Sequence, residues 1–284
     1  MNTMERNLLK NKIEYGIGMI CFILVCILVL APMLLMVVNS FKSNSEMLRN
    51  DSGLPEVWTL ESYKSLFTTY SSLVKHFYNS IIISIISTIC GTFICTLAAY
   101  AFAKYKFRGR ESIFYVLLAT LMIPSEVIIP GQYLFFAKLK LINTLAVQIL
   151  PTIPAVVGVY MIRQYMLGIP TSLIESAKID GAGHMRTFVT IIIPSAKPII
   201  SSYMILHFLD VWQNYTWPLL VATKQNIMPI MVSLPTLVDS VIGFVPVWGT
   251  IMAGSVLCSI PLIIVFLLNQ KAVMESVILG SIKG

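Results

Sequence analysis

The sequence predicts an all-α integral membrane protein with six transmembrane helices, and three observations lead to this fold class. Only 12% of the 284 residues are charged and 57% are hydrophobic, whereas a soluble domain has roughly 25% charged residues. The apolar residues gather in runs of about 20 or more, which is the length that crosses a bilayer as a helix. Lysine and arginine are concentrated in alternate loops between these runs, as is typical of multi-pass proteins.

The first apolar run covers residues 15–41 and follows Arg6, Lys10 and Lys12. A secretory signal peptide is the alternative interpretation, but its apolar core has about 7–15 residues and a small-residue cleavage site follows it. The run here is longer and no such site follows. We therefore expect residues 1–41 to form a cytoplasmic N-terminus and a retained first helix. Residues 42–78 then form a polar extracytoplasmic loop.

Five further apolar runs follow, and several are interrupted by proline or by charge. The second run ends at four basic residues within Lys104 to Arg110, which mark a cytoplasmic loop. The fourth contains Pro151 and Pro154, so we expect a kinked helix whose freed backbone groups are satisfied by neighbouring helices. The five spans are expected at residues 79–103, 112–129, 145–165, 198–220 and 247–268. Residues 131–144 and 223–246 are then outer segments, and residues 269–284 form a cytoplasmic tail.

The distribution of charge sets the expected orientation. With both termini in the cytoplasm, the inner segments hold 13 of the 20 lysine and arginine residues and the outer segments hold seven. This asymmetry agrees with the positive-inside rule. The net charge of +7 is therefore a signal of topology, and we expect no nucleic-acid partner.

A stretch of charged and small residues over residues 172–198 separates the fourth apolar run from the fifth. Ser172 and Glu175 have the spacing of a capping box at a helix start. Gly181 suits the left-handed position just past a helix end. The stretch therefore predicts a short helix of about two turns. Glu175 taken alone is explained equally well as the partner of the cap.

Within this stretch, Glu175-Ser176-Ala177, then Gly181, and later Ile191 to Pro194 closely resemble the cytoplasmic coupling loop of permease subunits of binding-protein-dependent ABC importers. In that family the loop forms a short helix that docks into a cleft of the ATPase. The form Ile179-Asp180-Gly181-Ala182 is similar to the carbohydrate branch, in the second permease of maltose-type importers. The resemblance implies these ATPase-coupling residues: Glu175, Ser176, Ala177, Asp180, Gly181, Ala182 and Pro194.

The resemblance extends from Trp58 to the C-terminus. Its matching pieces are Asn79-Ser80, Ala98 to Ala101, Met122 to Pro124, Phe208 with Trp212 and Pro218, and the terminal Ser281 to Gly284. Two departures bear on function. Gln213 stands where the family usually has asparagine, which leaves the polar contact there open. Gly183 stands where serine or threonine often caps the second helix of the loop, so that helix is expected to begin less firmly.

The resemblance implies a transmembrane subunit of an ATP-driven importer, with a permease core over residues 79–268 and a coupling loop over residues 166–197. Such a subunit forms half of the translocation pathway for a sugar, in the first place an oligosaccharide. Its implied partners are a second permease of the same six-helix type, an ABC ATPase dimer, an extracytoplasmic sugar-binding protein and the lipid bilayer. The implied location is the bacterial plasma (inner) membrane, with N- and C-termini in the cytoplasm.

Motifs of enzyme chemistry are missing from the sequence. There is no Gly-Lys pair and hence no P-loop, and no His-Glu-x-x-His or Gly-x-Ser-x-Gly motif occurs. The five cysteines lie in apolar runs without the spacing of metal ligands. We therefore expect no catalytic residue, no metal site and no cofactor bound by this chain. ATP and Mg²⁺ are expected on the partner ATPase.

A polar cluster in the fifth run is the candidate substrate pathway. It consists of Asp210, Trp212, Gln213 and Asn214. Such residues are suited to bind sugar hydroxyls and the C–H faces of sugar rings, but hydrogen bonding between helices at a subunit interface is an equal alternative. Glu126, between two prolines, is interpreted as a carboxylate that reaches water at the membrane interface. Tyr78, Tyr215 and Trp217 are predicted to form an aromatic belt.

Two other functions stay open on the sequence alone. An ion-coupled secondary transporter would use Asp210 or Glu126 as its ion site. An ABC permease for a polyol phosphate such as glycerol 3-phosphate is the other alternative. The outer loop 223–246 is apolar; in the resembled family the corresponding loop meets the binding protein, and packing against the chain's own helices is the alternative.

Overall fold

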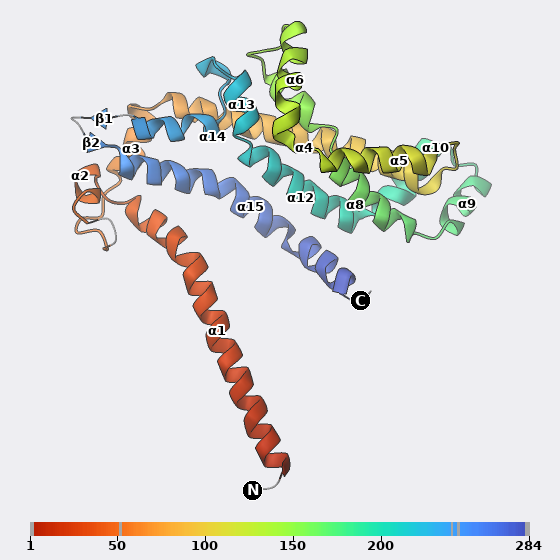
Figure 1. The fold of residues 1–284 in the computed structure, drawn as a ribbon, viewed down its shortest axis with the longest axis horizontal. Coiled ribbons are helices and arrows are strands. Elements are labelled where there is room, and N and C mark those ends of the chain that lie inside the picture. Colours follow the sequence, from red (N-terminus) through yellow and green to blue (C-terminus); the bar gives the residue numbers. More distant parts are fainter. Residues whose placement is uncertain (1–2, 51–52, 240, 243–244, 282–284) are drawn as a thin grey trace. The chain divides into compact units, whose positions relative to one another are not determined.

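The computed structural model describes residues 3–50, 53–239, 241–242 and 245–281. Figure 1 shows the helices and strands of the chain. They divide into two compact units. The first comprises Met1–Tyr70 with Thr236–Leu257, and the second comprises Ser71–Pro235 with Cys258–Gly284. Helices make up nearly all of the regular structure among the described residues. The predicted all-α class is confirmed.

The first unit contains α1 (Thr3–Asn39), α2 (Asn44–Met47), α3 (Glu61–Thr68) and the start of α15 (Trp248–Ser281). Its two short strands, β1 (Val241–Ile242) and β2 (Val245–Pro246), pair antiparallel. Residues Tyr15–Asn39 of α1 are long and apolar enough to cross a membrane, in agreement with the first predicted span. Their most apolar window is unburied. A helix that is apolar all round requires lipid or another apolar surface as its surroundings.

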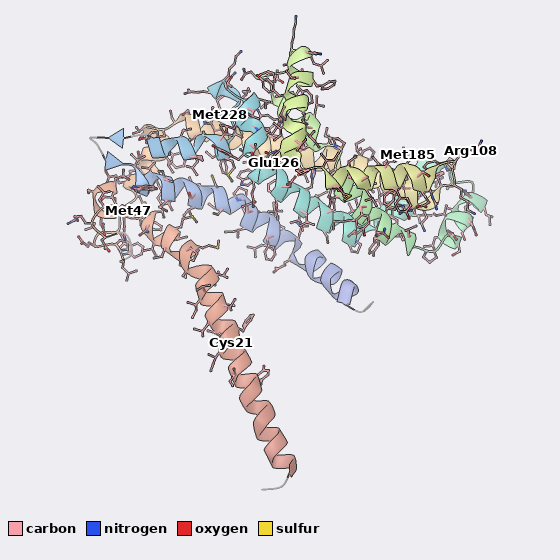
Figure 2. The ribbon with its side chains drawn as sticks, in the orientation of Figure 1. Cys21, Met47, Arg108, Glu126, Met185 and Met228 are labelled. Carbon is pink, nitrogen blue, oxygen red and sulfur yellow. The ribbon has the colours of Figure 1, made fainter. Side chains whose placement is uncertain are left out.

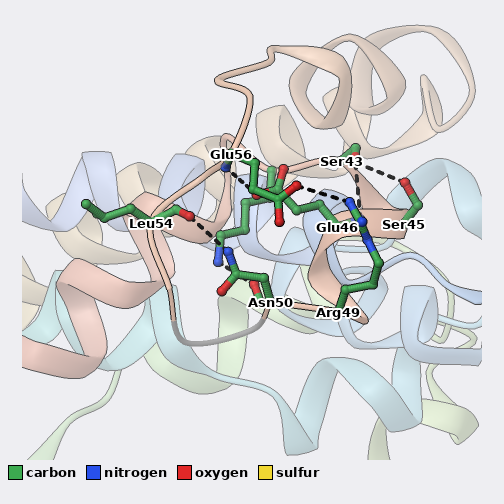
Figure 3. Close-up of polar contacts among 8 residues, drawn as sticks. Ser43, Ser45, Glu46, Arg49, Asn50, Leu54 and Glu56 are labelled. Atoms are coloured by element: carbon green, nitrogen blue, oxygen red, sulfur yellow. Dashed lines mark hydrogen bonds and ion pairs between the residues drawn. The ribbon is translucent and has the colours of Figure 1, made fainter.

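The predicted polar loop after α1 is held by its own hydrogen bonds (Figure 3). Ser43 Oγ accepts the N–H of Glu46 at 3.2 Å and so caps α2. The Glu46 carboxylate in turn accepts the N–H of Glu56 at 2.6 Å, and Asn50 Nδ2 donates to the carbonyl of Leu54 at 2.9 Å. Lys42 is fully buried. These bonds satisfy backbone groups that would otherwise be left without partners in a segment lacking long helices.

Helix α4 (Ser72–Lys104) is central to the second unit and packs against α8 (Val156–Leu167) and α12 (Lys197–Gln213). Its buried residues are mostly small or hydroxyl-bearing and include Ser84, Ser87, Thr88, Gly91, Thr92, Cys95 and Ala99. A Cβ added at Gly91 would lie 2.5 Å from His207 Nε2, and one added at Gly158 would overlap the Tyr203 ring. Small residues therefore let these three helices approach closely, as is usual between transmembrane helices.

The described residues include two bent pairs of helices, one at the expected third span and one that joins the end of the coupling loop to the expected fifth span. Residues Arg110–Met122 and Ser125–Lys138 meet at 102°, and His184–Ser195 and Lys197–Gln213 meet at 81°. The first pair consists of α5 (Arg110–Ala119), η1 (Thr120–Met122) and α6 (Ser125–Lys138), and the second of α10 (His184–Thr187), the π-helical turn η3 (Phe188–Ile192), α11 (Ile193–Ser195) and α12. Among the described residues, four helical segments are long and apolar enough to span a membrane, or up to six if each bent pair counts as one span.

The first bend corrects the predicted third span. Ile123, between η1 and α6, has an extended backbone at φ −88° and ψ 118°, as proline favours for the residue before it. Pro124 itself has no N–H with which to continue the ladder. The helix predicted for residues 112–129 therefore breaks after Met122. Helix α6 occupies much of the predicted outer segment 131–144.

The remaining spans agree with the sequence in place but not always in length. The fourth is interrupted as predicted, since α7 (Leu145–Ile149) and η2 (Leu150–Thr152) precede α8. The fifth is shorter than predicted, because α12 ends at Gln213 and α13 (Thr216–Val221) follows as a separate helix. Helix α15 continues to Ser281, so the expected tail 269–284 is helical up to that residue. The last three residues of the terminal motif, 282–284, lie outside the described residues.

Candidate functional site

The predicted coupling helix is present as α9 (Ser172–Ile179). Its C-terminal end forms a complete Schellman motif: Gly181 has φ +76°, its N–H donates to the carbonyl of Lys178 at 3.0 Å, and the N–H of Ala182 donates to the carbonyl of Ala177 at 2.8 Å. These are the two bonds that define the motif. The prediction that Gly181 takes the left-handed position past the helix end is confirmed.

The N-terminal end of α9 differs from the prediction. The N-cap residue is Thr171, it is already helical at φ −67° and ψ −25°, and no side chain caps the helix. A capping box needs an extended N-cap residue, so the predicted box of Ser172 and Glu175 is wrong. The N–H of Glu175 instead donates to the carbonyl of Thr171 at 3.0 Å. The interpretation of Glu175 as a mere capping partner is thereby removed.

Helix α9 is divided into an anchored face and an exposed face. Ile174 and Ala177 are buried, three residues apart on one side. The exposed residues that follow the equally exposed Ser172 are Leu173, Glu175, Ser176, Lys178, Ile179 and Asp180. Ile179 is 87% exposed, although isoleucine usually lies inside a protein. We call these six residues the coupling surface. The side chain of Glu175 has no hydrogen bond or ion pair with any other described residue.

The second arm of the coupling loop returns the chain to the membrane helices. Helix α10 has Gly183 as its N-cap residue and no side-chain cap, as the sequence predicted. Met185 on α10 is 60% exposed and lies at the same end of the second unit as Arg108 of the basic loop (Figure 2). Pro194 is exposed in α11, at the 81° bend before α12.

The coupling loop is tied to the basic loop that follows α4. Lys104 Nζ donates to the carbonyl of Ile169 at 2.6 Å, and a hydrogen bond of 2.7 Å joins the Tyr105 hydroxyl to His184 Nδ1. The Phe188 ring stacks on Tyr100 with centroids 5.4 Å apart. Ile174, Phe188 and Ile192 belong to the same hydrophobic core as Tyr100, Met166 and Tyr203. Displacing α9 would therefore displace α4, α8 and α12, because a close-packed core transmits strain.

An ion pair between a buried arginine and a half-exposed glutamate, which the sequence analysis missed, joins α8 to α5. Arg163 Nη2 lies 2.9 Å from both carboxylate oxygens of Glu111. Its guanidinium carbon lies 3.9 Å from the centroid of the Phe114 ring, and Nε donates to the carbonyl of Phe102 at 3.3 Å. The Arg163 side chain is 7% exposed, whereas that of Glu111 is 46% exposed. An arginine inside an apolar run was the available signal, since such charges are normally paired.

This exposure difference predicts an asymmetric response to mutation. Glu111→Gln should lower the Tm by several degrees, because it leaves the buried Arg163 guanidinium without its charge partner. Arg163→Met should lower the Tm less, since it removes the buried charge and leaves a half-exposed carboxylate still 2.7 Å from Arg110. Thermal unfolding of both variants in detergent measures the difference. The reverse order of the two Tm values would contradict this account of the ion pair.

The candidate substrate residues do not form one cluster. Asp210 and Gln213 are exposed and three residues apart, so they share a face of α12. Trp212 is 1% exposed and packs against Phe77 and Phe208, with centroids 5.7 and 5.9 Å away. Asn214 is the C-cap residue of α12. The expectation that Trp212 offers a sugar-stacking face beside Asp210 is corrected by its burial.

Two further aromatic and acidic residues can be assigned. Trp217 is buried and its Nε1–H donates to the carbonyl of Val147 at 2.8 Å, so its predicted place in an aromatic belt is wrong. Tyr78 and Tyr215 are exposed, as the belt requires. Glu126 is exposed at the start of α6 (Figure 2) and accepts a hydrogen bond from Ser125 Oγ at 3.1 Å. Among the described residues no group of three or more His, Cys, Asp or Glu could hold a metal ion.

The part of the last outer loop in the second unit is fastened by side chains that bond to its backbone. It comprises η4 (Gln225–Ile227) and α14 (Ile230–Ser233). His76 Nε2 bonds to the carbonyl of Gln225 at 2.7 Å. The Asn79 amide donates to the carbonyls of Asn226 and Met228 at 3.1 and 3.0 Å. Gln148 Nε2 donates to the carbonyl of Ile227 at 3.0 Å. Packing against the chain's own helices, the alternative left open by the sequence, is observed here. Asn79-Ser80, quoted only as a matching motif, thus has a structural role.

Asn143 closes this anchor from the other side. Its Oδ1 accepts hydrogen bonds from the N–H and hydroxyl of Thr223 at 2.8 and 3.0 Å and from the N–H of Lys224 at 3.0 Å. Its backbone has φ +63°, which asparagine tolerates better than most residues. Both the side chain and the backbone of Asn143 therefore favour asparagine.

Replacing Asn143 should loosen the start of the outer loop. Asn143→Ala is expected to cost about 1–3 kcal/mol locally, because three exposed donors of Thr223 and Lys224 lose their acceptor and alanine is strained at positive φ. Faster tryptic cleavage after Lys224 would measure the opening. Asn143→Gly is the matched control, since glycine relieves the strain but provides no acceptor. Cleavage of the Ala variant at the wild-type rate would contradict the anchor.

Comparisons with known proteins place these features in a wider context. The family described as "Binding-protein-dependent transport system inner membrane component" matches residues 91–274. The chain is 31% identical over 280 residues to the arabinooligosaccharides transport system permease protein AraQ of Halalkalibacterium halodurans, with 98% of each chain covered. It is 30% identical over 269 residues to the sn-glycerol-3-phosphate transport system permease protein UgpE of Rhizobium meliloti, covering 92% of this chain and 95% of the relative.

One solved structure resembles the fold closely. A chain in the crystal structure of a bacterial ABC transporter involved in the import of the acidic polysaccharide alginate superposes with a TM-score of 0.83. The match covers 92% of this chain and 97% of that chain, at 21% sequence identity. At this identity the similarity is one of fold.

Proposed function

The chain belongs to the family of binding-protein-dependent transport system inner membrane components, and on that premise we propose that it conducts a sugar, in the first place an oligosaccharide. It is a non-catalytic transmembrane subunit of an ABC importer. The sugar is supported by the similarity to the arabinooligosaccharide permease over nearly the full length of both chains. ABC-importer membership decides against the ion-coupled secondary transporter as the main function.

The observation that carries the proposed mechanism is the coupling surface. A short helix with a defined C-terminal end presents the carboxylate of Glu175, which has no partner among the described residues, together with exposed Leu173 and Ile179. Exposed apolar residues beside an unpaired charge are typical of a surface that another protein covers. The proposed partner is the ATPase, which binds ATP and Mg²⁺. Ser176 and Asp180 belong to the same surface, and Gly181 and Ala182 form the turn that ends the helix.

The proposed action is mechanical. Closure of the ATPase dimer pulls on α9, and the movement passes through Ile174 and the core around Phe188 to α4, α8 and α12. Packed elements of this kind respond as rigid bodies with discrete arrangements. The chain's part is to transmit the displacement and to open its half of the pathway. Asp210 and Gln213, on the exposed face of α12, are proposed to line that pathway.

The remaining partners and the orientation complete the proposal. A second permease of the same type covers the exposed apolar helices, and an extracytoplasmic binding protein delivers the sugar. The basic loop after α4 and the coupling loop lie in the cytoplasm with both termini, as the distribution of lysine and arginine supports. Residues 42–78 and 223–246 then face outward. The segment boundaries at residues 41, 78, 268 and 269 stay predictions.

Glycerol 3-phosphate is the second candidate substrate, because the chain is also 30% identical to a glycerol-3-phosphate permease. An uptake assay with competing substrates distinguishes an oligosaccharide from glycerol 3-phosphate as the transported substrate. Cells whose only copy of the gene is plasmid-borne are assayed for uptake of labelled arabinotriose, with unlabelled arabinotriose or glycerol 3-phosphate as competitor. Uptake that is blocked by ATP depletion and by the unlabelled sugar is expected. Absence of arabinotriose uptake, together with ATP-dependent uptake of labelled glycerol 3-phosphate by the same cells, would transfer the proposal to the polyol phosphate.

Purification provides the independent test of the assembly. The tagged chain is extracted from its native membrane in mild detergent, and the co-purifying proteins are identified by mass spectrometry. A P-loop ATPase and a second helical permease are the expected partners. Recovery of the chain alone, with uptake that survives ATP depletion, would overturn the proposed coupling to ATP.

A further inference from the structure

A pocket of about 570 Å³ opens in the first unit, between the starts of α2, α3 and α15. Its volume lies within the ~300–1,000 Å³ typical of small-molecule sites. All of its lining residues belong to the first unit. The lining consists mainly of hydroxyl and amide side chains, among them Asn44, Ser62, Ser65, Thr68, Thr69 and Thr250.

Helix α3 supplies one wall of this pocket. Ser62, Ser65 and Thr69 follow one another at intervals of three and four residues, so they lie on one face. Two hydroxyls of this wall are fixed by donating to the protein itself: Ser62 Oγ donates to the carbonyl of Lys42 at 3.0 Å, and Thr68 Oγ1 donates to that of Lys64 at 2.9 Å. Each retains lone pairs with which to accept a hydrogen bond.

The start of α15 supplies the opposite side. Asn44 Oδ1 accepts the N–H of Gly249 at 2.9 Å, and a Cβ added at Gly249 would lie 2.5 Å from Ser62 Oγ. This close approach holds α15 against α2 and α3 and so preforms the pocket. Thr250 is fully buried, and its Oγ1 has no hydrogen-bond partner among the described residues. A buried hydroxyl without a partner is costly, and this one belongs to the lining of a polar pocket.

The charges of the lining balance. Glu61 and Lys64 contribute one carboxylate and one ammonium, so the pocket does not favour an ion of either sign. Hydroxyls both donate and accept hydrogen bonds, which suits a ligand with the same property at several positions. No aromatic side chain belongs to the lining among the described residues, so we expect weak binding, with a Kd of ~1 mM.

We propose that this pocket binds one ring of a neutral sugar at the outer face of the importer, with the Thr250 hydroxyl completing the set of hydrogen bonds. This inference rests on the proposed function, because the proposed function includes the outward orientation of residues 42–78. A weak site on the outward-facing segment would hold the sugar after the binding protein releases it. The pocket shares no lining residue with the coupling surface and does not include Asp210.

Binding of arabinotriose to the full importer complex in lipid nanodiscs tests the proposal. Saturation-transfer NMR without ATP or binding protein gives the affinity for the wild type and for variants. Thr250→Val keeps the shape and removes the hydroxyl, so it should weaken binding about 3- to 10-fold without lowering the Tm. Ser65→Leu should fill the pocket and abolish this component of binding. Ser71→Leu, at an exposed serine outside the pocket, should leave the affinity unchanged.

The outcomes separate this inference from the proposed function, because binding is measured without transport. Wild-type affinity in both Thr250→Val and Ser65→Leu would overturn the pocket, whether or not ATP-dependent uptake is normal. Tighter binding of glycerol 3-phosphate than of arabinotriose would overturn the neutral ligand class. Loss of binding-protein docking in Ser65→Leu, with sugar affinity unchanged, would replace the sugar by a protein contact. If ATP-dependent uptake is absent but Thr250→Val and Ser65→Leu still weaken sugar binding, the transport proposal is overturned and the pocket proposal stands.

Discussion

Glu175→Lys is expected to reduce ATP-dependent uptake by roughly 100-fold or more while leaving membrane insertion intact. The carboxylate of Glu175 is exposed and unpaired among the described residues, so nothing in the fold depends on it. If it pairs with a basic residue of the ATPase, losing that partner costs about 2–5 kcal/mol, much of it from leaving the other charge buried and unpaired. Lysine adds repulsion to that loss.

Three measurements make this expectation decisive. Uptake of labelled sugar reports transport, immunoblotting of the membrane fraction reports insertion, and co-purification reports ATPase binding. Glu175→Gln should lie between the wild type and the lysine variant, because an amide keeps the shape and part of the hydrogen bonding. Normal uptake in Glu175→Lys at wild-type membrane levels would remove Glu175 from the coupling surface.

Gly181→Val is expected to abolish co-purification of the ATPase. Gly181 has φ +76°, and a β-branched residue there costs about 1–3 kcal/mol of backbone strain. A Cβ at Gly181 meets nothing within 4 Å, so the effect comes from the backbone and not from a collision. The strain opposes both bonds of the Schellman motif, and α9 would lose its defined end. The exposed face that carries Glu175 would then no longer be presented to the partner.

Gly183 provides a matched control two residues further along. It also has open space around a Cβ, but its φ is −69°, which any residue adopts. Gly183→Val should therefore retain the ATPase, and Gly181→Asn should retain most of it, since asparagine tolerates the left-handed region. Equal loss of the ATPase in Gly181→Val and Gly183→Val would show that bulk, and not the left-handed position, is what matters.

The two ends of α9 show how far local sequence carries a prediction. The end was predictable, because the left-handed requirement at Gly181 is a property of one residue and its neighbours. The start of the helix was not predictable. Whether Ser172 or Thr171 is the N-cap residue depends on the path of the chain after α8, and Lys104 fixes this path by donating to the carbonyl of Ile169. A side-chain cap forms only if the N-cap residue itself has non-helical backbone angles, and these angles depend on contacts with residues that are distant in sequence.

The substrate residues show the same limit on a helix face. Asp210, Trp212 and Gln213 are close in sequence, and their chemistry suggested one polar cluster. On a helix, residues two positions apart point in different directions, so Trp212 lies in the core while Asp210 and Gln213 are exposed. Which direction is inward depends on where α4 lies, and the sequence of α12 alone does not contain that information.

The sequence by itself determined the membrane class, the approximate places of the apolar runs, the charge asymmetry and the coupling motif with its glycine. These follow from composition and from interactions within a few residues, which act in any tertiary arrangement. Only the tertiary structure decided the two bends, the Arg163–Glu111 pair, the anchor of the outer loop and the unpartnered Thr250 hydroxyl. Each of these joins residues far apart in the chain, and burial and hydrogen-bond partners are fixed only when the helices pack.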